Sequence, residues 1–170
     1  MNEKILVAAY AKELETEAVA TRKCLERIPE NVFDFKPHPT SMPMGYLSLL
    51  VAEIPLWITY MVEQREIDFA TFKHAEIKTN KELVAHFDEN MEGAKKALQQ
   101  ASEENLQKIF SLKNKGQVIF SVPVIDYIAP TLSHWVHHRG QLFVYMRISG
   151  IAVPSIYGPS ADDRQFSTPA

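Results

Sequence analysis

Four long stretches of the chain carry apolar residues at three- and four-residue steps, the spacing that places them on one face of an α-helix. Pro29 stops the first stretch, and Asp126 and Gly150 suit the N-cap and C-cap of the last. Pro55 lies inside the second, where it removes one backbone hydrogen bond and predicts a kink rather than a break. The helices so predicted cover residues 3–28, 44–64, 80–101 and 126–149.

Before the last helix the pattern changes to two short apolar runs, KIFSL and QVIFSV, on either side of the turn residues 113–116. This arrangement predicts a short hairpin. Residues 150–170 contain prolines and glycines that cannot continue a helix, so we expect an extended tail in which Asp162 and Asp163 face water. Four helices of this length bury their apolar faces most simply as a four-helix bundle. The predicted fold is therefore all-α, with one domain over residues 1–170.

Composition narrows the class of protein. The chain has 170 residues, 46% of them hydrophobic, which is enough for one domain with a substantial core. Its net charge is -3 and its Lys and Arg are dispersed, which argues against a nucleic-acid partner. The apolar N-terminal stretch is interrupted by Lys12 and Glu13 and is too short to span a membrane. We expect a cytoplasmic protein with no membrane partner, in which the single Cys24 is a buried hydrophobe rather than a nucleophile.

The segment SHWVHHRGQ, residues 133–141, holds three of the six histidines. In a helix His134 and His138 lie one turn apart on one face, the spacing that presents two imidazoles to one metal ion. Tyr127, Gln141 and Tyr145 continue the same line beside the apolar face, which is typical of a polar pocket between helices. Two histidines at this spacing also occur on solvated helix faces, so the spacing alone leaves both interpretations open.

These residues carry a resemblance to a known family. SHWVHHRGQLFVYMR, followed by SGIAVPSIYGPSADD, resembles the C-terminal signature of the DinB family of bacterial four-helix-bundle proteins. FDFKPHPTSMPMGYLSLLVAEIPLW resembles the entry of that family into its second helix, and TRKCLERIPE its first helix. The resemblance implies a site for nickel or zinc held by three histidines, two of which fall on His134 and His138. His137 is then structural or supports those two. Family members of known activity use the metal to activate a low-molecular-weight thiol.

The chain departs from the family at the third ligand. The family pattern Met-x-x-Gly-x-Leu-x-x-His falls here on residues 42–50, and Leu50 stands at the place of the histidine. Leucine donates no lone pair, and two imidazoles alone hold a metal weakly. Glu53, one turn further along the helix, or Tyr46, one turn back, are the replacements within reach. Glu53 is equally compatible with a solvated or ion-paired carboxylate.

Other polar residues are expected to be structural. His38 lies in a Pro-His-Pro loop and is expected to order it. His74 and His86 have no partner at ligand spacing and are predicted to be surface residues. Arg139 points away from His138 on the helix and is predicted to form an ion pair or to anchor the tail.

Three functions remain after this comparison. The first is a DinB-like protein of unassigned activity with a degenerate two-histidine site, in which nickel or zinc is weakly bound or absent. The second is a metal-dependent thiol transferase or related enzyme, with Glu53 or water as third donor and Gln141 or Tyr145 supporting the ligands. The third is a metal-free bundle that binds a small molecule or has a structural role as a dimer. Leu50 favours the degenerate site and the metal-free bundle over the enzyme. The expected partners are a second copy of the chain and a small molecule or low-molecular-weight thiol.

Overall fold

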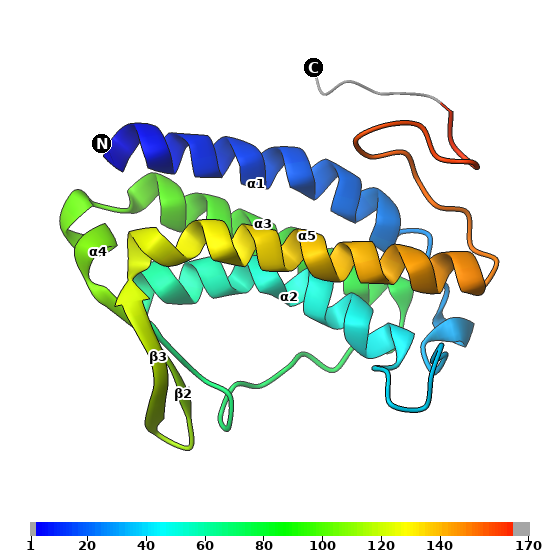
Figure 1. Ribbon diagram of the computed structural model, residues 1–170, viewed down its shortest axis with the longest axis horizontal. Helices are drawn as coiled ribbons and strands as arrows, with labels where there is room; N and C mark the ends of the chain where they lie inside the picture. The colour runs from blue at the N-terminus through cyan, green and yellow to red at the C-terminus, as the bar shows by residue number, and fades with distance from the viewer. Residues whose placement is uncertain (1–2, 165–170) are drawn as a thin grey trace.

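The computed structural model describes residues 3–164, and four long helices lying side by side dominate it (Figure 1). Helix α1 packs against α3 and α5, and α2 packs against the same two helices. All four predicted helices are present, although the first ends three residues before the predicted boundary at residue 28. Their bounds are Glu3–Leu25 for α1, Met44–Glu63 for α2, Asn80–Gln100 for α3 and Val124–Ile148 for α5.

Helix α2 is the most buried of the four and holds the centre of the core. It is long and apolar enough to cross a membrane by length and composition, and 67% of its most apolar window is buried inside the fold. Trp135 of α5 donates a 2.8 Å hydrogen bond from Nε1 to the Val51 carbonyl oxygen and packs its ring 6.1 Å from that of Phe87. Burial in this core accounts for the apolar composition of α2.

The start of α2 is held by the loop that precedes it, which contains the short helix η1, Glu30–Val32. The backbone N–H of Met44 donates to the carbonyl of Phe35, and that of Gly45 donates to the carbonyl of Phe33, each at 2.8 Å. His38 orders this loop as predicted, with its Nδ1 2.8 Å from Thr40 Oγ1. Further along, the helix continues without a break through Pro55.

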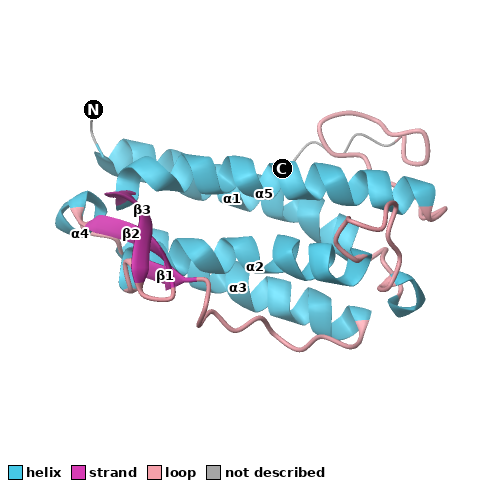
Figure 2. Ribbon diagram, turned by 60° about the horizontal axis from the view of Figure 1, so that its bottom comes forward, coloured by secondary structure: helices cyan, strands magenta, loops and turns pink. Residues whose placement is uncertain are grey.

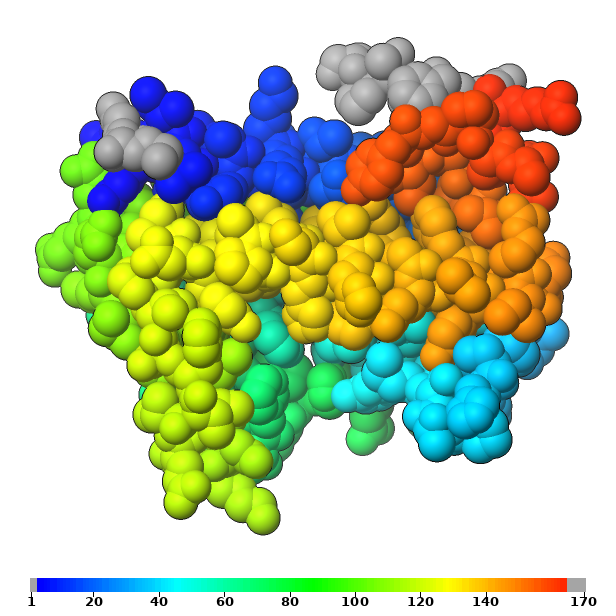
Figure 3. All heavy atoms as spheres, viewed as in Figure 1, coloured from blue at the N-terminus to red at the C-terminus, as the bar shows by residue number. Residues whose placement is uncertain are grey.

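The fold is mostly helical, as predicted, but a small three-stranded sheet means that a purely all-α bundle is not confirmed. The strands are β1, Glu66–Asp68, β2, Ile109–Asn114, and β3, Gln117–Pro123, with β2 in the middle, parallel to β1 and antiparallel to β3 (Figure 2). The predicted hairpin is confirmed, and its tip residues Lys115 and Gly116 both have positive φ, at 52° and 76°. The hairpin projects from the bundle (Figure 3). Strand β1 was not predicted because three residues are too few for a periodic pattern.

The boundaries of the last helix also differ from the prediction. A short helix, α4, Glu103–Gln107, comes before the hairpin, and β3 runs directly into α5. Pro123 therefore occupies the N-cap position, and Asp126 lies in the first turn, where its carboxylate faces the positive end of the helix dipole. At the other end Gly150 adopts a φ of 73°, and the N–H of Ile151 bonds to the carbonyl of Met146. The glycine thus stops the helix as expected.

The segment after α5 folds back over the end of α1 (Figure 1). Buried Arg139 contacts Glu17 at 2.5 Å, Thr21 Oγ1 at 3.0 Å and the Tyr157 hydroxyl at 2.6 Å. The Tyr157 hydroxyl also donates to Glu17 at 2.8 Å. The prediction that Arg139 forms an ion pair or anchors the tail is confirmed.

The two acids of this segment do not simply face water, contrary to expectation. Asp162 lies 2.6 Å from Arg147 and accepts the N–H of Val153, and Asp163 lies 3.4 Å from Arg27. They bind the tail to α5 and to the end of α1, contacts that only the folded chain brings together. The last predicted tail residues, 165–170, lie outside the described residues.

Candidate functional site

Helix α5 brings His134 and His138 together as its periodicity predicts. Their Nε2 atoms are 2.7 Å apart and their ring centroids 4.5 Å apart, and both side chains are partly buried. Burial lowers the pKa of both imidazoles. Neighbouring histidines lower the pKa of His134 further, whereas the hydrogen bond to Gln141 partly offsets the lowering at His138. Trp57 of α2 lies against the pair, with its ring centroid 5.6 Å from that of His134. The site therefore consists of two imidazoles, whose burial favours the neutral form, beside an indole.

The hydrogen bonds define where the protons lie. His138 Nδ1 is 2.8 Å from Gln141 Oε1, an oxygen that accepts, so His138 carries its proton on Nδ1. In the neutral ring Nε2 is then an acceptor, and His134 Nε2 donates to it. Gln141 thus orients the His138 ring and belongs to this hydrogen-bonded row.

The donor set does not fit a closed three-ligand metal site. Two imidazole nitrogens on one tetrahedral zinc ion lie about 3.3 Å apart, so binding would require the rings to separate by about 0.6 Å. Leu50, at the place of the third family ligand, packs half-buried against the core. Within residues 3–164, no three His, Cys, Asp or Glu side chains are grouped so that they could hold a metal ion.

Glu53 is engaged elsewhere, and this corrects the prediction for two histidines. Its Oε2 lies 2.5 Å from His74 Nδ1, and its Oε1 accepts the N–H of Ala75 at 2.9 Å and lies 3.4 Å from His86 Nε2. The prediction that His74 and His86 lack a partner is therefore wrong, whereas His74 is exposed, as predicted for a surface residue, and His86 is half-buried. The segment between β1 and α3 brings His74 to α2, a contact 21 residues apart in sequence that no local pattern reveals.

The rest of the predicted polar line on α5 has other roles. Tyr145 is buried with its ring 6.2 Å from that of Phe35, and Tyr127 stacks on Phe110 with ring centroids 5.5 Å apart. His137 is exposed, with its ring 5.2 Å from that of His138. The line is thus polar at its centre and aromatic at both ends.

Cys24 is buried, and desolvation raises the pKa of its thiol to about 12, so it is a core residue rather than a nucleophile. Trp57 was missed as part of the histidine site. It lies seven residues after Leu50, two helical turns along the same face, and that spacing was the available signal.

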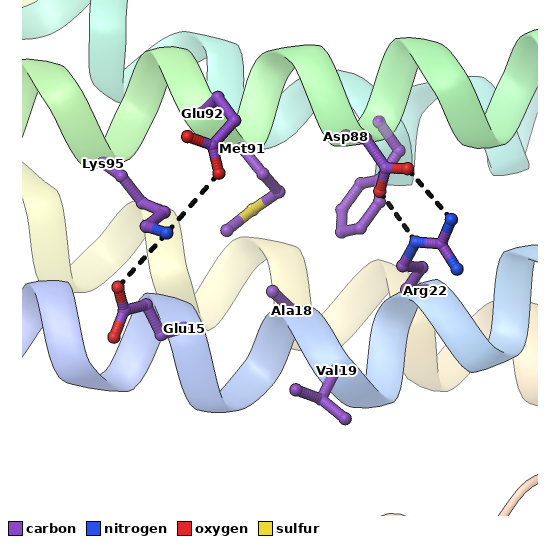
Figure 4. Close-up of a pocket in the computed structure, with 9 residues that line it drawn as sticks. Glu15, Ala18, Val19, Arg22, Asp88, Met91, Glu92 and Lys95 are labelled. Carbon is purple, nitrogen blue, oxygen red and sulfur yellow. Dashed lines mark hydrogen bonds and ion pairs between the residues drawn. The ribbon is translucent and has the colours of Figure 1, made fainter.

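A separate hollow of about 380 Å³ lies between α1 and α3 (Figure 4). An ion pair spans each end: Arg22 contacts Asp88 at 2.8 Å, and Lys95 lies 3.5 Å from Glu15. Apolar side chains, among them Met91, lie between the two pairs. With its charged groups paired across the helices, this hollow strengthens the α1–α3 contact and is not part of the histidine site.

Fold and site together define a mostly helical protein with a small sheet and a paired-histidine site on its last long helix. The family model described as DinB family matches residues 1–169, and the chain belongs to the DinB family.

Solved structures agree on the fold. A DinB-like protein of Bacillus subtilis has a TM-score of 0.65 and 19% identity, covering 84% of this chain and 92% of that one. A DinB-like protein from Bacillus cereus has a TM-score of 0.66 and 19% identity, covering 87% and 95%. A third, from Exiguobacterium sibiricum, has a TM-score of 0.65 and 16% identity, covering 85% and 92%. Among curated sequences, Uncharacterized protein YrdA of Bacillus subtilis is 50% identical over 32 residues, and the match spans only 19% of each chain.

Proposed function

We propose that this chain is a DinB-family protein with a degenerate metal site, in which His134 and His138 bind nickel or zinc weakly and serve mainly as a polar site for a small ligand. The contact that carries the proposal is the 2.7 Å Nε2–Nε2 hydrogen bond between the two histidines. Each ring satisfies the other with one shared proton. Metal binding must therefore break a hydrogen bond and gain only two protein ligands.

Two further features support a ligand other than a metal. Leu50 places an apolar side chain where the family has its third histidine, and an apolar neighbour disfavours a bare cation. Trp57, which packs on His134, has a buried indole N–H with no acceptor among the described residues. An N–H donor repels a cation and binds an acceptor oxygen, so this group favours a small polar ligand.

The first test is the metal content of protein purified without a histidine tag. Elemental analysis is expected to find nickel and zinc well below one ion per chain, and calorimetric titration with zinc is expected to show weak binding. One tightly bound ion per chain would refute the degenerate site and favour the metal-dependent thiol transferase, with a third donor that this arrangement does not supply.

The second test restores the missing ligand. Leu50→His is expected to raise zinc affinity at least about tenfold, because a third imidazole adds a protein ligand to the pair. Leu56→His is the matched control, since Leu56 is also half-buried on α2 but lies about 240° around the helix. Equal affinities in the two variants would show that α2 does not present residue 50 to the histidine pair.

A further inference from the structure

A second polar cluster joins α2 to the segment between β1 and α3. Glu53 is 1% exposed, and its Oε2 lies 2.5 Å from Nδ1 of His74. The other nitrogen of that ring, Nε2, lies 3.4 Å from the hydroxyl oxygen of Tyr46. A buried carboxylate, an imidazole and a hydroxyl thus follow one another, and the last two are exposed.

The partners of Glu53 assign the protons along this chain. A carboxylate accepts, so His74 donates from Nδ1, and its Nε2 lone pair faces the O–H of Tyr46. The ring of Phe72 lies 5.1 Å from that of His74 and helps to hold its orientation. This is the order of groups that activates a hydroxyl nucleophile in enzymes: a base beside the hydroxyl, oriented by a third group.

A structural role explains only part of the cluster. Glu53 also accepts the backbone N–H of Ala75 at 2.9 Å, and that bond by itself attaches the segment to α2. His86 of α3 approaches the same carboxylate at 3.4 Å. Neither contact requires the second nitrogen of His74 to face a phenol.

Tyr46 also lines a hollow of about 500 Å³ between the start of α2 and the loops on either side of it. Its walls include the apolar side chains of Phe33, Leu49 and Leu83, and Lys78 is among its polar residues. This volume lies in the range of small-molecule sites, and the mainly apolar lining with few polar groups is typical of them.

We propose that Tyr46 is a nucleophile for small acyl or sulfonyl electrophiles with an apolar body, with His74 as its base and Glu53 as a positioning residue. In the transfer the phenol oxygen forms a bond to the carbonyl carbon or sulfonyl sulfur. The leaving group departs with its bonding electron pair, and the phenolic proton passes to His74 Nε2. This site is separate from the His134 and His138 pair and does not depend on the function proposed for it.

Phenylmethanesulfonyl fluoride is a suitable probe, since attack releases fluoride and leaves a sulfonyl ester on the tyrosine. Peptide mass spectrometry is expected to place the label on Tyr46 in the wild-type chain and to find none there in Tyr46→Phe. His74→Gln is expected to slow labelling at least about tenfold, because a general base contributes about 100-fold or more to the rate of an enzymatic step. His38→Ala, which removes an exposed loop histidine, is the control and is expected to label at the wild-type rate.

Imidazole rescue separates a base from a structural residue. Because 37% of the His74 side chain is exposed, added imidazole can reach the space left by His74→Ala and is expected to restore most of the labelling rate at Tyr46. Glu53→Gln is expected to label more slowly than wild type while keeping its thermal transition. Labelling at Tyr46 that neither falls without His74 nor recovers with imidazole would overturn the proposal.

Discussion

Gly45, at the start of α2, packs so closely against the preceding loop that only glycine fits. A Cβ at this position would lie 2.9 Å from the Cβ of Phe33 and 3.3 Å from its carbonyl oxygen. The same glycine N–H donates to that carbonyl, so the backbone cannot move away without losing a hydrogen bond. Gly45, the glycine of the family pattern, therefore has a packing role: it lets the start of α2 lie close to the loop at Phe33.

Gly45→Ala is expected to lower the free energy of unfolding by about 1–3 kcal/mol, because the added methyl group overpacks the contact with Phe33. Urea denaturation measures the change. Gly140→Ala in α5 is the control: a Cβ there meets nothing within 4 Å, and alanine is expected to stabilise the helix by about 0.5–1 kcal/mol. Equal effects of the two substitutions would contradict the close packing at Gly45.

The histidine pair predicts a pH dependence of stability. Burial lowers the pKa of His134 and His138 below the ordinary value of 6.5, so the folded state binds fewer protons than the unfolded state at mildly acidic pH. Their contribution is fully present above pH 6.5 and is lost as the pH falls toward the lowered values. The thermal midpoint of wild type is expected to fall more steeply from about pH 7 to about pH 5 than that of His134→Gln/His138→Gln. His38→Gln is the control and is expected to keep the wild-type slope. If His134→Gln/His138→Gln also kept the wild-type slope, the histidine pair would not be the cause of the pH dependence.

At the scale of elements, a capping box holds the start of α3. The Thr79 side chain accepts the N–H of Glu82 at 3.2 Å, and the Glu82 carboxylate accepts the N–H of Thr79 at 2.9 Å. These reciprocal bonds satisfy helix-end donors. The backbone N–H of Lys78, followed by the bonds with Thr79, lowers the pKa of Glu82. They also set the point at which the segment carrying His74 gives way to the helix carrying His86.

Thr79→Ala is expected to cost about 1 kcal/mol of stability, because the Glu82 N–H loses its acceptor. The matched control is Thr16→Ala, an exposed threonine inside α1 whose hydroxyl bonds back to the Lys12 carbonyl, for which a change within about 0.5 kcal/mol is expected. Chemical denaturation compares the two. A loss at Thr16 as large as at Thr79 would show that the capping box has no special effect.

At the scale of the whole molecule, a buried ion pair joins α1 to α5 and, through Tyr157, holds the C-terminal segment against both helices. Arg139 of α5 contacts Glu17 of α1, and the Tyr157 hydroxyl of the C-terminal segment bridges them. Both charged side chains are nearly fully buried. Removing one partner therefore leaves the other charge buried without compensation.

Arg139→Met keeps most of the side-chain volume and is expected to destabilise the protein by about 3–5 kcal/mol, because Glu17 remains buried and unpaired. Arg147→Met is the control, since the Arg147 side chain is 50% exposed in its pair with Asp162 and its loss is expected to cost about 1 kcal/mol or less. Thermal and urea unfolding measure both variants. A loss below about 1 kcal/mol for Arg139→Met would show that the buried pair does not hold the tail.

The regular elements were predictable to the extent that their signals are local. Periodic apolar positions predicted four helices, and the Lys115-Gly116 turn predicted the hairpin. Strand β1 was not predictable, because it pairs with β2 through Ile67 and Leu112, which lie 45 residues apart in the sequence. A three-residue strand has too short a pattern to identify it without that partner.

The sequence by itself determined the four long helices and the convergence of His134 and His138, since these depend on residues within a few turns of one another, and its motifs indicated the family. Only the tertiary structure decided which polar groups meet across elements. It joined Glu53 to His74 and His86, buried Arg139 on Glu17, and placed Trp57 on His134. The physical reason is that a helix face is encoded in local periodicity, whereas contacts between helices, loops and tail depend on how the whole chain closes around its core.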